Sequence, residues 1–182
     1  EEGLPVTSEA TTHHFSLTDA SCASYDPVFK VHPPLRTDAD VKAVKEGLAD
    51  GTIDAIATDH APHTDHSKEK PFSEAPPGML GLETAFSIAL EESELDIHQI
   101  FSLMSWRPAV IAGISNRHGM TVSPGSRANL CVIDLDETWT VSGKSMASFS
   151  SNTPYEGRRL RGHVRHTIQS GEAVVIDGEA QR

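Results

Sequence analysis

The chain has 182 residues, enough for one domain or for one domain and a small module, and 37% of them are hydrophobic. Its formal net charge of −11 argues against nucleic acid and against an anionic membrane surface as partners, because both need clustered Lys and Arg. No apolar stretch approaches the roughly 18 residues that cross a bilayer, and the only cysteines, Cys22 and Cys131, lie far apart. Two such thiols are typical of a reduced, cytoplasmic protein.

The first two-thirds of the chain alternates strand-like and helix-like segments. A short strand is expected over residues 6–10 and a long loop over residues 21–35. A helix should follow, with Thr37 as its N-cap, Asp40 in the capping-box position and Gly51 as its stop.

The pattern then continues with a second strand and more helices. Residues 54–58 read as a short buried strand. Apolar residues at helical spacing predict amphipathic helices around residues 82–90 and 97–104, the latter capped by Asp96. Arg107-Pro108 can start a further short helix, since Pro is tolerated in the first turn.

The character of the chain changes near Gly119, and we place a domain boundary there, with residues 1–118 as an α/β part and residues 119–182 as a small all-β domain. Four β-like runs separated by turn residues occupy the second part: 129–133, 138–141, 164–168 and 173–176. Two parallel strands cannot close a barrel alone, because each needs a neighbour on both sides. The α/β part is therefore expected to be incomplete, and the start at Glu1 without an initiator Met is interpreted as a cut inside a longer protein.

The segment from Ala57 to His63 carries the strongest chemical signal. Asp59 follows the buried strand at the edge where α/β barrels gather their catalytic groups. Its carboxylate could bind a metal and exchange a proton with water, and His63 could bind an anionic substrate. The competing interpretation is a surface loop that happens to contain histidines. A complete zinc site is disfavoured, since it needs three or four ligands and no two histidines are spaced as H-x-H.

Three further segments are weaker candidates. If His13 and His14 continue the first strand, at most one of them can face a site, and a structural role is favoured for both. Residues 25–36 form either a substrate wall or a rigid Pro-Pro connector. Residues 76–79 either present backbone N–H groups to a ligand or form an ordinary Pro-Gly turn.

Together these segments resemble the bacterial type I dihydroorotase family of the amidohydrolase superfamily, in its C-terminal portion. The matching motifs are Thr-Thr-His-His-Phe at 11–15, Phe-Lys-Val-His-Pro-Pro-Leu-Arg at 29–36, Ala-Thr-Asp-His-Ala-Pro-His at 57–63, Ala-Pro-Pro-Gly-Met-Leu-Gly-Leu-Glu-Thr at 75–84 and Asn-Thr-Pro-Tyr-Glu-Gly at 152–157. The motifs occur in the family's order and span nearly the whole chain.

The resemblance implies the last strands of a TIM-type (β/α)8 barrel followed by a small β-sandwich domain. It implies zinc-dependent, reversible hydrolysis of dihydroorotate to N-carbamoyl-L-aspartate in pyrimidine biosynthesis, with two Zn²⁺ ions in the complete protein. At the matching positions, Asp59 would bind zinc and shuttle the proton. His63 and the backbone at Pro77 and Gly78 would hold the substrate.

Two departures from the family pattern stand out. The H-x-H motif and the other metal ligands have no counterpart here, so only Asp59 carries over and the chain alone is expected to be inactive. His32 replaces the family's substrate-contacting Asn, and a neutral imidazole cannot reproduce an amide's paired donor and acceptor.

Alternatives remain open at this point. A related cyclic amidase, an allantoinase or hydantoinase, shares the chemistry. A non-catalytic partner of aspartate transcarbamoylase belongs to a different class, and the retained Asp59 and His63 argue against it. The third alternative is a free-standing module, whose exposed barrel edges would promote association. Homo-oligomerisation is left open.

Overall fold

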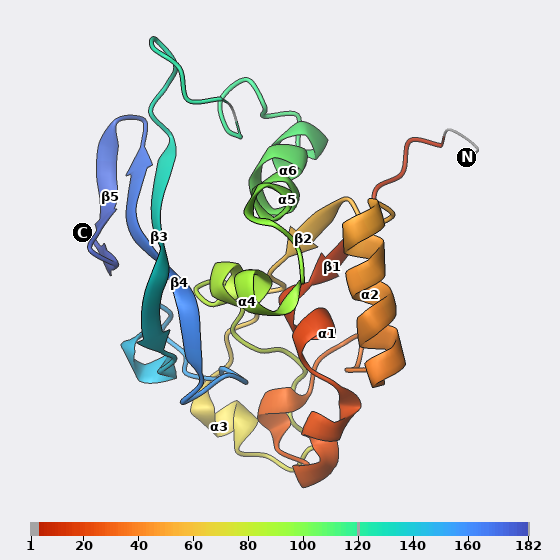
Figure 1. Cartoon of the computed structure of the whole chain (residues 1–182). Helices are drawn as coiled ribbons and strands as arrows, with labels where there is room; N and C mark the ends of the chain where they lie inside the picture. The colour runs from red at the N-terminus through yellow and green to blue at the C-terminus, as the bar shows by residue number, and fades with distance from the viewer. Residues whose placement is uncertain (1–3, 120, 182) are drawn as a thin grey trace.

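The structure is a computed structural model that describes residues 4–119 and 121–181. The helices are α1 (Thr12–Ser16), α2 (Asp38–Asp50), α3 (Asp65–Lys68), α4 (Ala85–Glu92), α5 (Ile97–Phe101) and α6 (Arg107–Ile111), with 3-10 turns η1 (Asp19–Ser24), η2 (Pro27–Phe29) and η4 (Gly143–Ser145) and a π-helical turn η3 (Ser102–Trp106). The strands are β1 (Glu9–Thr11), β2 (Ala55–Ala57), β3 (Leu130–Thr140), β4 (Arg159–Gln169), β5 (Glu172–Ile176) and β6 (Glu179–Ala180). The four-stranded sheet and the parallel pair lie on opposite sides of α4 (Figure 1).

The parallel pair β1–β2 confirms the two strands expected in the α/β part. The register places Thr11 opposite Ala57, so both strands end at the same level. Helix α2 connects them and begins as expected: the Thr37 side chain accepts from the Asp40 amide, and the Asp40 carboxylate accepts from the Thr37 amide. Gly51 ends the helix in the left-handed conformation, with φ of 85°.

One local expectation was wrong. Residues 12–14 do not continue β1 but turn at once into α1, whose Thr12 and Phe15 are fully buried. The loop expected at residues 21–35 is present, and it includes η2 and the end of η1, which begins at Asp19. The expected helices near 97–104 and at Arg107-Pro108 do occur, but the π-helical turn η3 joins them into one segment.

The β-rich part forms one antiparallel sheet, in the order β3-β4-β5-β6, within the described residues. The runs expected at 129–133 and 138–141 belong to a single strand, β3, whose pairing with β4 is irregular between Asp134 and Thr138. The Asp134 carboxylate accepts hydrogen bonds from the amides of Asp136 and Glu137. These two amides lie in the stretch of β3 that does not pair with β4, so the carboxylate replaces their missing strand partners. A bulge, rather than a turn, separates the two runs.

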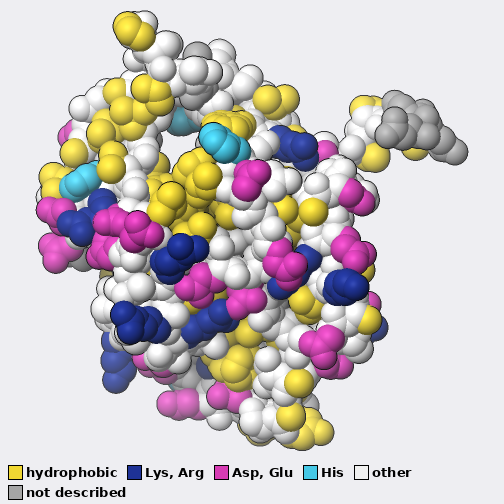
Figure 2. Space-filling view, in the orientation of Figure 1, with side chains coloured by type: hydrophobic (Ala, Val, Ile, Leu, Met, Phe, Trp, Pro, Cys, Tyr) yellow, Lys and Arg dark blue, Asp and Glu magenta, His cyan; other side chains and the backbone are white. Residues whose placement is uncertain are grey.

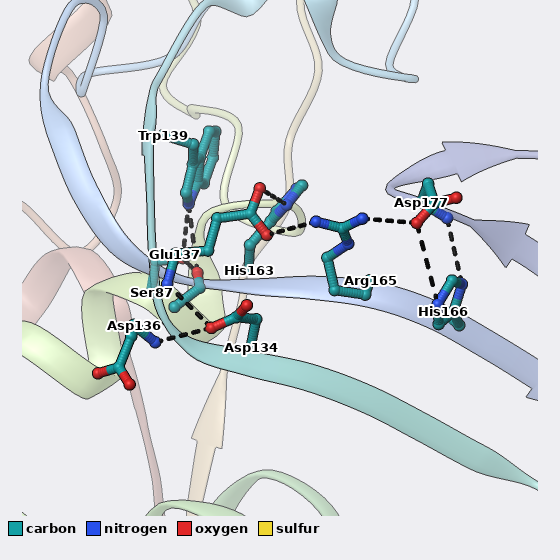
Figure 3. Close-up of polar contacts among 10 residues, drawn as sticks. Ser87, Asp134, Asp136, Glu137, Trp139, His163, Arg165, His166 and Asp177 are labelled. Atoms are coloured by element: carbon teal, nitrogen blue, oxygen red, sulfur yellow. Dashed lines mark hydrogen bonds and ion pairs between the residues drawn. The ribbon is translucent and has the colours of Figure 1, made fainter.

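Ion pairs attach the β5–β6 turn to the rest of this sheet (Figure 3). Glu137, in the irregular stretch of β3, lies 3.3 Å from His163 Nδ1 and accepts a 3.1 Å hydrogen bond from Arg165. Arg165 also donates to Asp177, at 2.6 Å. Side chains on one face of the sheet thereby connect β3, β4 and the β5–β6 turn.

One hydrophobic core runs through both parts of the chain. Val141, Tyr155 and Leu160 from the β-rich part pack in the same cluster as Phe15 and Ile56. Between α4 and the sheet a depression remains, with a volume of about 740 Å³ and hydrophobic side chains gathered in it (Figure 2). The boundary at residues 118/119 stays a prediction. No helix within residues 4–119 and 121–181 has the length and hydrophobicity needed to span a bilayer.

Candidate active site

Each strand of the parallel pair is followed by a titratable side chain, and both side chains lie at the carboxyl-terminal edge of the pair. Asp59 lies two residues beyond the end of β2, and His13 lies two residues beyond the end of β1. Because Thr11 and Ala57 are partners in the register, these equal offsets bring the side chains together. His13 Nε2 lies 3.9 Å from an Asp59 carboxylate oxygen.

The His13 side chain is buried and makes no hydrogen bond to the residues that the structure describes. It is 1% exposed, and neither ring nitrogen has a hydrogen-bond partner among residues 4–119 and 121–181. Burial, and then the neighbouring His14, lower the pKa of His13 to about 3. The imidazole is therefore neutral at pH 7, and one nitrogen keeps a free lone pair. A buried polar group without a partner is costly, and such groups are common where a ligand or ion completes the site.

His14 has a structural role. Its Nε2 donates to the Pro33 carbonyl at 3.0 Å, and its Nδ1 accepts from the Thr11 hydroxyl at 2.6 Å. Both ring nitrogens are used, and the imidazole ties α1 to the segment around Pro33. His60 is similarly occupied, because its Nδ1 accepts the amides of Gly81 and Leu82.

Asp59 faces an open cavity. Its side chain is 47% exposed, and its backbone adopts φ of 44°, a left-handed conformation that Asp and Asn tolerate better than most residues. The cavity has a volume of about 490 Å³, and its wall includes Asp59, His14, His32 and Arg36. His32 thus shares a cavity with Asp59, as a wall formed by residues 25–36 would require.

His63, Pro77 and Gly78 form a second group, outside the residues that line that cavity. His63 Nε2 donates to the Pro77 carbonyl at 2.9 Å. Gly78 has φ of 132°, and a Cβ at this position would lie 2.7 Å from both Ala61 Cβ and His63 Nε2. Only glycine fits there.

One backbone donor expected near a ligand is already used. The Gly78 amide donates to the Lys30 carbonyl at 2.8 Å, and Pro77 has no N–H. The Gly78 amide is thus satisfied within the protein, and the substrate contact expected at Pro77 and Gly78 stays a prediction. The segment's first role is to hold His63.

Two lysines, Lys30 and Lys68, connect the loops around the site. Lys30 Nζ donates to the carbonyls of Phe72, Ser73 and Ala75. Lys68 Nζ donates to the carbonyls of Pro27 and Pro76, and burial, and then the positive charge of Lys30, lower its pKa to about 8.

No cluster of three or more His, Cys, Asp or Glu residues that could hold a metal ion occurs in the part of the chain that the structure describes. His13 and Asp59 make a pair only. His13 was missed as a candidate ligand because it was placed on a strand. The signal that could have found it is its distance from the end of β1, which equals that of Asp59 from the end of β2.

Comparison with known proteins gives a consistent picture. The sequence matches the Amidohydrolase family over residues 19–174. It is 48% identical over 181 residues to a dihydroorotase of Streptomyces coelicolor and 43% identical over 182 residues to one of Elusimicrobium minutum, alignments that cover 97% and 98% of this chain. The chain spans about two-fifths of the length of these relatives, 42% and 41% respectively.

Among solved structures, the fold is similar to two hydantoinases. The L-hydantoinase of Arthrobacter aurescens superimposes with a TM-score of 0.91 at 29% identity, over 100% of this chain and 42% of that protein. The D-hydantoinase of a Thermus species gives a TM-score of 0.86 at 26% identity, over 98% of this chain and 41% of that protein. Part of a barrel followed by a small sheet domain is therefore the correct description of the fold.

Proposed function

This chain belongs to the amidohydrolase family, and from that premise we propose that it supplies part of the active site of a metal-dependent dihydroorotase. The reaction is the reversible hydrolysis of dihydroorotate to N-carbamoyl-L-aspartate. The identities of 43–48% to dihydroorotases support this substrate. The activity belongs to a protein of the relatives' full length.

The observation that carries the proposal is the convergence of His13 and Asp59 at the carboxyl ends of neighbouring parallel strands. One is a neutral imidazole with no partner, and the other is a carboxylate 3.9 Å away. Neutral imidazole and carboxylate are ordinary ligands of divalent transition metals. The residues present therefore fit a metal ion.

A bound Zn²⁺ ion would supply Lewis-acid chemistry at this edge of the barrel. His13 and Asp59 would be two of its ligands, and His13 joins Asp59 in this role although the sequence pointed to Asp59 alone. Two ligands are too few for catalytic zinc, which takes three protein ligands and an open position. The remaining ligands, and a second Zn²⁺ ion, are assigned to other parts of the longer protein, and this chain alone is expected to be inactive.

Asp59 and His63 have different proposed roles in the reaction. Asp59 is open to the cavity and can accept a proton and return it to the leaving ring nitrogen. His63 donates through Nε2 to the Pro77 carbonyl, so only Nδ1 is left for a substrate.

Hydantoin hydrolysis is the second candidate, because both solved structures named above are hydantoinases. His32 lies on the wall of the Asp59 cavity and so belongs to the groups that would select the ring substituents. The retained pair of His13 and Asp59 favours an enzyme over a non-catalytic partner of aspartate transcarbamoylase. We propose a cytoplasmic enzyme, which the two free thiols support. Self-association and transcarbamoylase binding remain predictions.

The test is turnover by the full-length protein loaded with Zn²⁺, with dihydroorotate, hydantoin and allantoin compared in parallel. Asp59→Asn is the informative variant, because Asn also tolerates positive φ and keeps the loop conformation. We expect dihydroorotate to be preferred and its turnover to fall by about 10²–10⁴-fold in the variant, the usual contribution of a general acid–base group. A folded, zinc-loaded protein that hydrolyses none of the three substrates would overturn the proposal.

A further inference from the structure

A segment of the β-rich part, residues 147–155, lies against the loops that follow β2, and we call it the strap. The Glu83 carboxylate accepts the amides of Ala147 and Ser148, and the Ser151 hydroxyl donates to Asp65 at 2.9 Å. The segment runs past α3 at the lower end of the sheet (Figure 1). The strap therefore contacts the loop region between residues 59 and 84 at two places, Asp65 and Glu83.

Asn152 is the centre of these contacts. Its Oδ1 accepts the His63 amide at 3.0 Å, and its Nδ2 donates to the carbonyls of Ala61 and Gly78 at 3.1 and 3.3 Å. Its backbone carbonyl accepts the Leu80 amide at 3.1 Å. The residue is 6% exposed. A single side chain therefore joins the His63 turn to the Gly78 turn.

The shape of a carboxamide explains why this position holds Asn. One face must accept from an N–H while the other donates to two carbonyls, and only an amide offers both from one planar group. An Asp carboxylate would keep the contact with the His63 amide and place a negative oxygen against two carbonyls. The Ala61 and Gly78 carbonyls would then lose their donor.

We propose that Asn152 is a positioning residue for the substrate-binding histidine, acting through the backbone of His63 and Gly78. The inference rests on the proposed function for its kinetic consequence, but the positioning itself does not depend on which substrate is bound. The sheet domain would then take part in catalysis by fixing the imidazole of His63 against Pro77. The backbone of Gly78 lies so close to the His63 imidazole that a side chain would not fit between them. A small shift of the His63 turn or of the Gly78 turn would therefore move the imidazole.

The experiment compares Asn152→Ala and Asn152→Asp with Thr153→Val in the full-length, zinc-loaded protein. Thr153 is the matched control: it is adjacent and 3% exposed, and its hydroxyl accepts the Tyr155 amide, within the same segment. Two readouts are taken. One is hydrogen–deuterium exchange of the segments 61–63 and 78–80, and the other is kcat and KM for dihydroorotate.

We expect faster exchange confined to 61–63 and 78–80 in Asn152→Ala, with KM raised on the order of 10-fold or more, as for other residues that orient active-site groups. Asn152→Asp should keep the His63 amide protected while the 78–80 segment exchanges faster. Thr153→Val should leave both segments and KM unchanged.

A purely structural role gives a different pattern. Loss of folded protein would lower apparent kcat in proportion, leave KM unchanged and speed exchange throughout the chain in both Asn152 variants, while the Thr153→Val control stays unchanged. That result would overturn the proposal, as would unchanged exchange at 61–63 in Asn152→Ala. If the wild-type protein fails to hydrolyse dihydroorotate, the proposed function falls while the exchange readout still decides the positioning role.

Discussion

Replacing His13 with Leu should stabilise the metal-free protein. The two side chains are similar in volume, and such swaps in a core usually cost less than about 1.5 kcal/mol. Against this, His13 buries two ring nitrogens without partners, and an unsatisfied buried polar group costs about 1–3 kcal/mol. The net change expected is a gain of about 1–2 kcal/mol in the free energy of unfolding, because the desolvation penalty of the imidazole disappears.

The assay is urea unfolding of the full-length protein, first with a chelator and then with added Zn²⁺. Without metal, the midpoint of His13→Leu should lie above that of the wild type, with an unchanged slope. With Zn²⁺ at about 100 times the dissociation constant, binding stabilises the wild type by about 2.7 kcal/mol. The variant lacks a ligand and gains less, so the order of the two midpoints should reverse.

Two results would refute this reasoning. A metal-free variant less stable than wild type by more than 1 kcal/mol, roughly the value of one hydrogen bond, would show that His13 makes a contact absent from the structure. Equal stabilisation of both proteins by Zn²⁺ would show that His13 is not a ligand.

Three further outcomes are expected. Gly78→Ala should destabilise the protein by more than Gly125→Ala in thermal unfolding. Both positions have positive φ, which costs a substituted residue about 1–3 kcal/mol, but of the two only Gly78 has atoms within 3 Å of the added Cβ. Equal losses of stability would contradict this prediction. Burial raises the pKa of Tyr155 to about 12 from an ordinary value of 10, so the free energy of unfolding falls as pH rises through this range, by roughly 1 kcal/mol at pH 11; urea unfolding of Tyr155→Phe should lack this loss, and parallel pH profiles would refute it. Lys30→Met removes the donor of three carbonyls and should speed proteolysis between residues 70 and 77, whereas the exposed Lys70→Met should not; equal cleavage of both variants would count against this role.

The parts of the fold that the sequence predicted well depend on local interactions. Thr37 and Asp40 are three residues apart and exchange their capping bonds within one turn, so the helix start could be read directly. The parts predicted wrongly depend on distant contacts. Residues 12–14 have the appearance of a continuing strand, but α1 forms because Thr12 and Phe15 are buried by segments far along the chain.

The same distinction holds for the site. Asp59 could be proposed as a site residue from the sequence because its motif is contiguous. His13 was missed because its nearness to Asp59 depends on the pairing of β1 with β2, which lie 46 residues apart in the register. Asn152 contacts Ala61 across 91 residues, and no local pattern marks that contact. The substrate contact expected at Pro77 and Gly78 stays a prediction, and no sequence pattern indicated that the Gly78 amide donates to the Lys30 carbonyl.

The shared core has a consequence for synthesis on the ribosome. The loops that carry Asp59 and His63 lack their partner until Asn152 has been made, and Val141, Tyr155 and Leu160 complete the cluster that contains Phe15 and Ile56. At about 5–20 residues per second, the 91 residues from Ala61 to Asn152 take on the order of 5–20 s to translate. During that interval the nascent β1–β2 region exposes apolar surface, so chaperone demand should peak before the last sheet emerges.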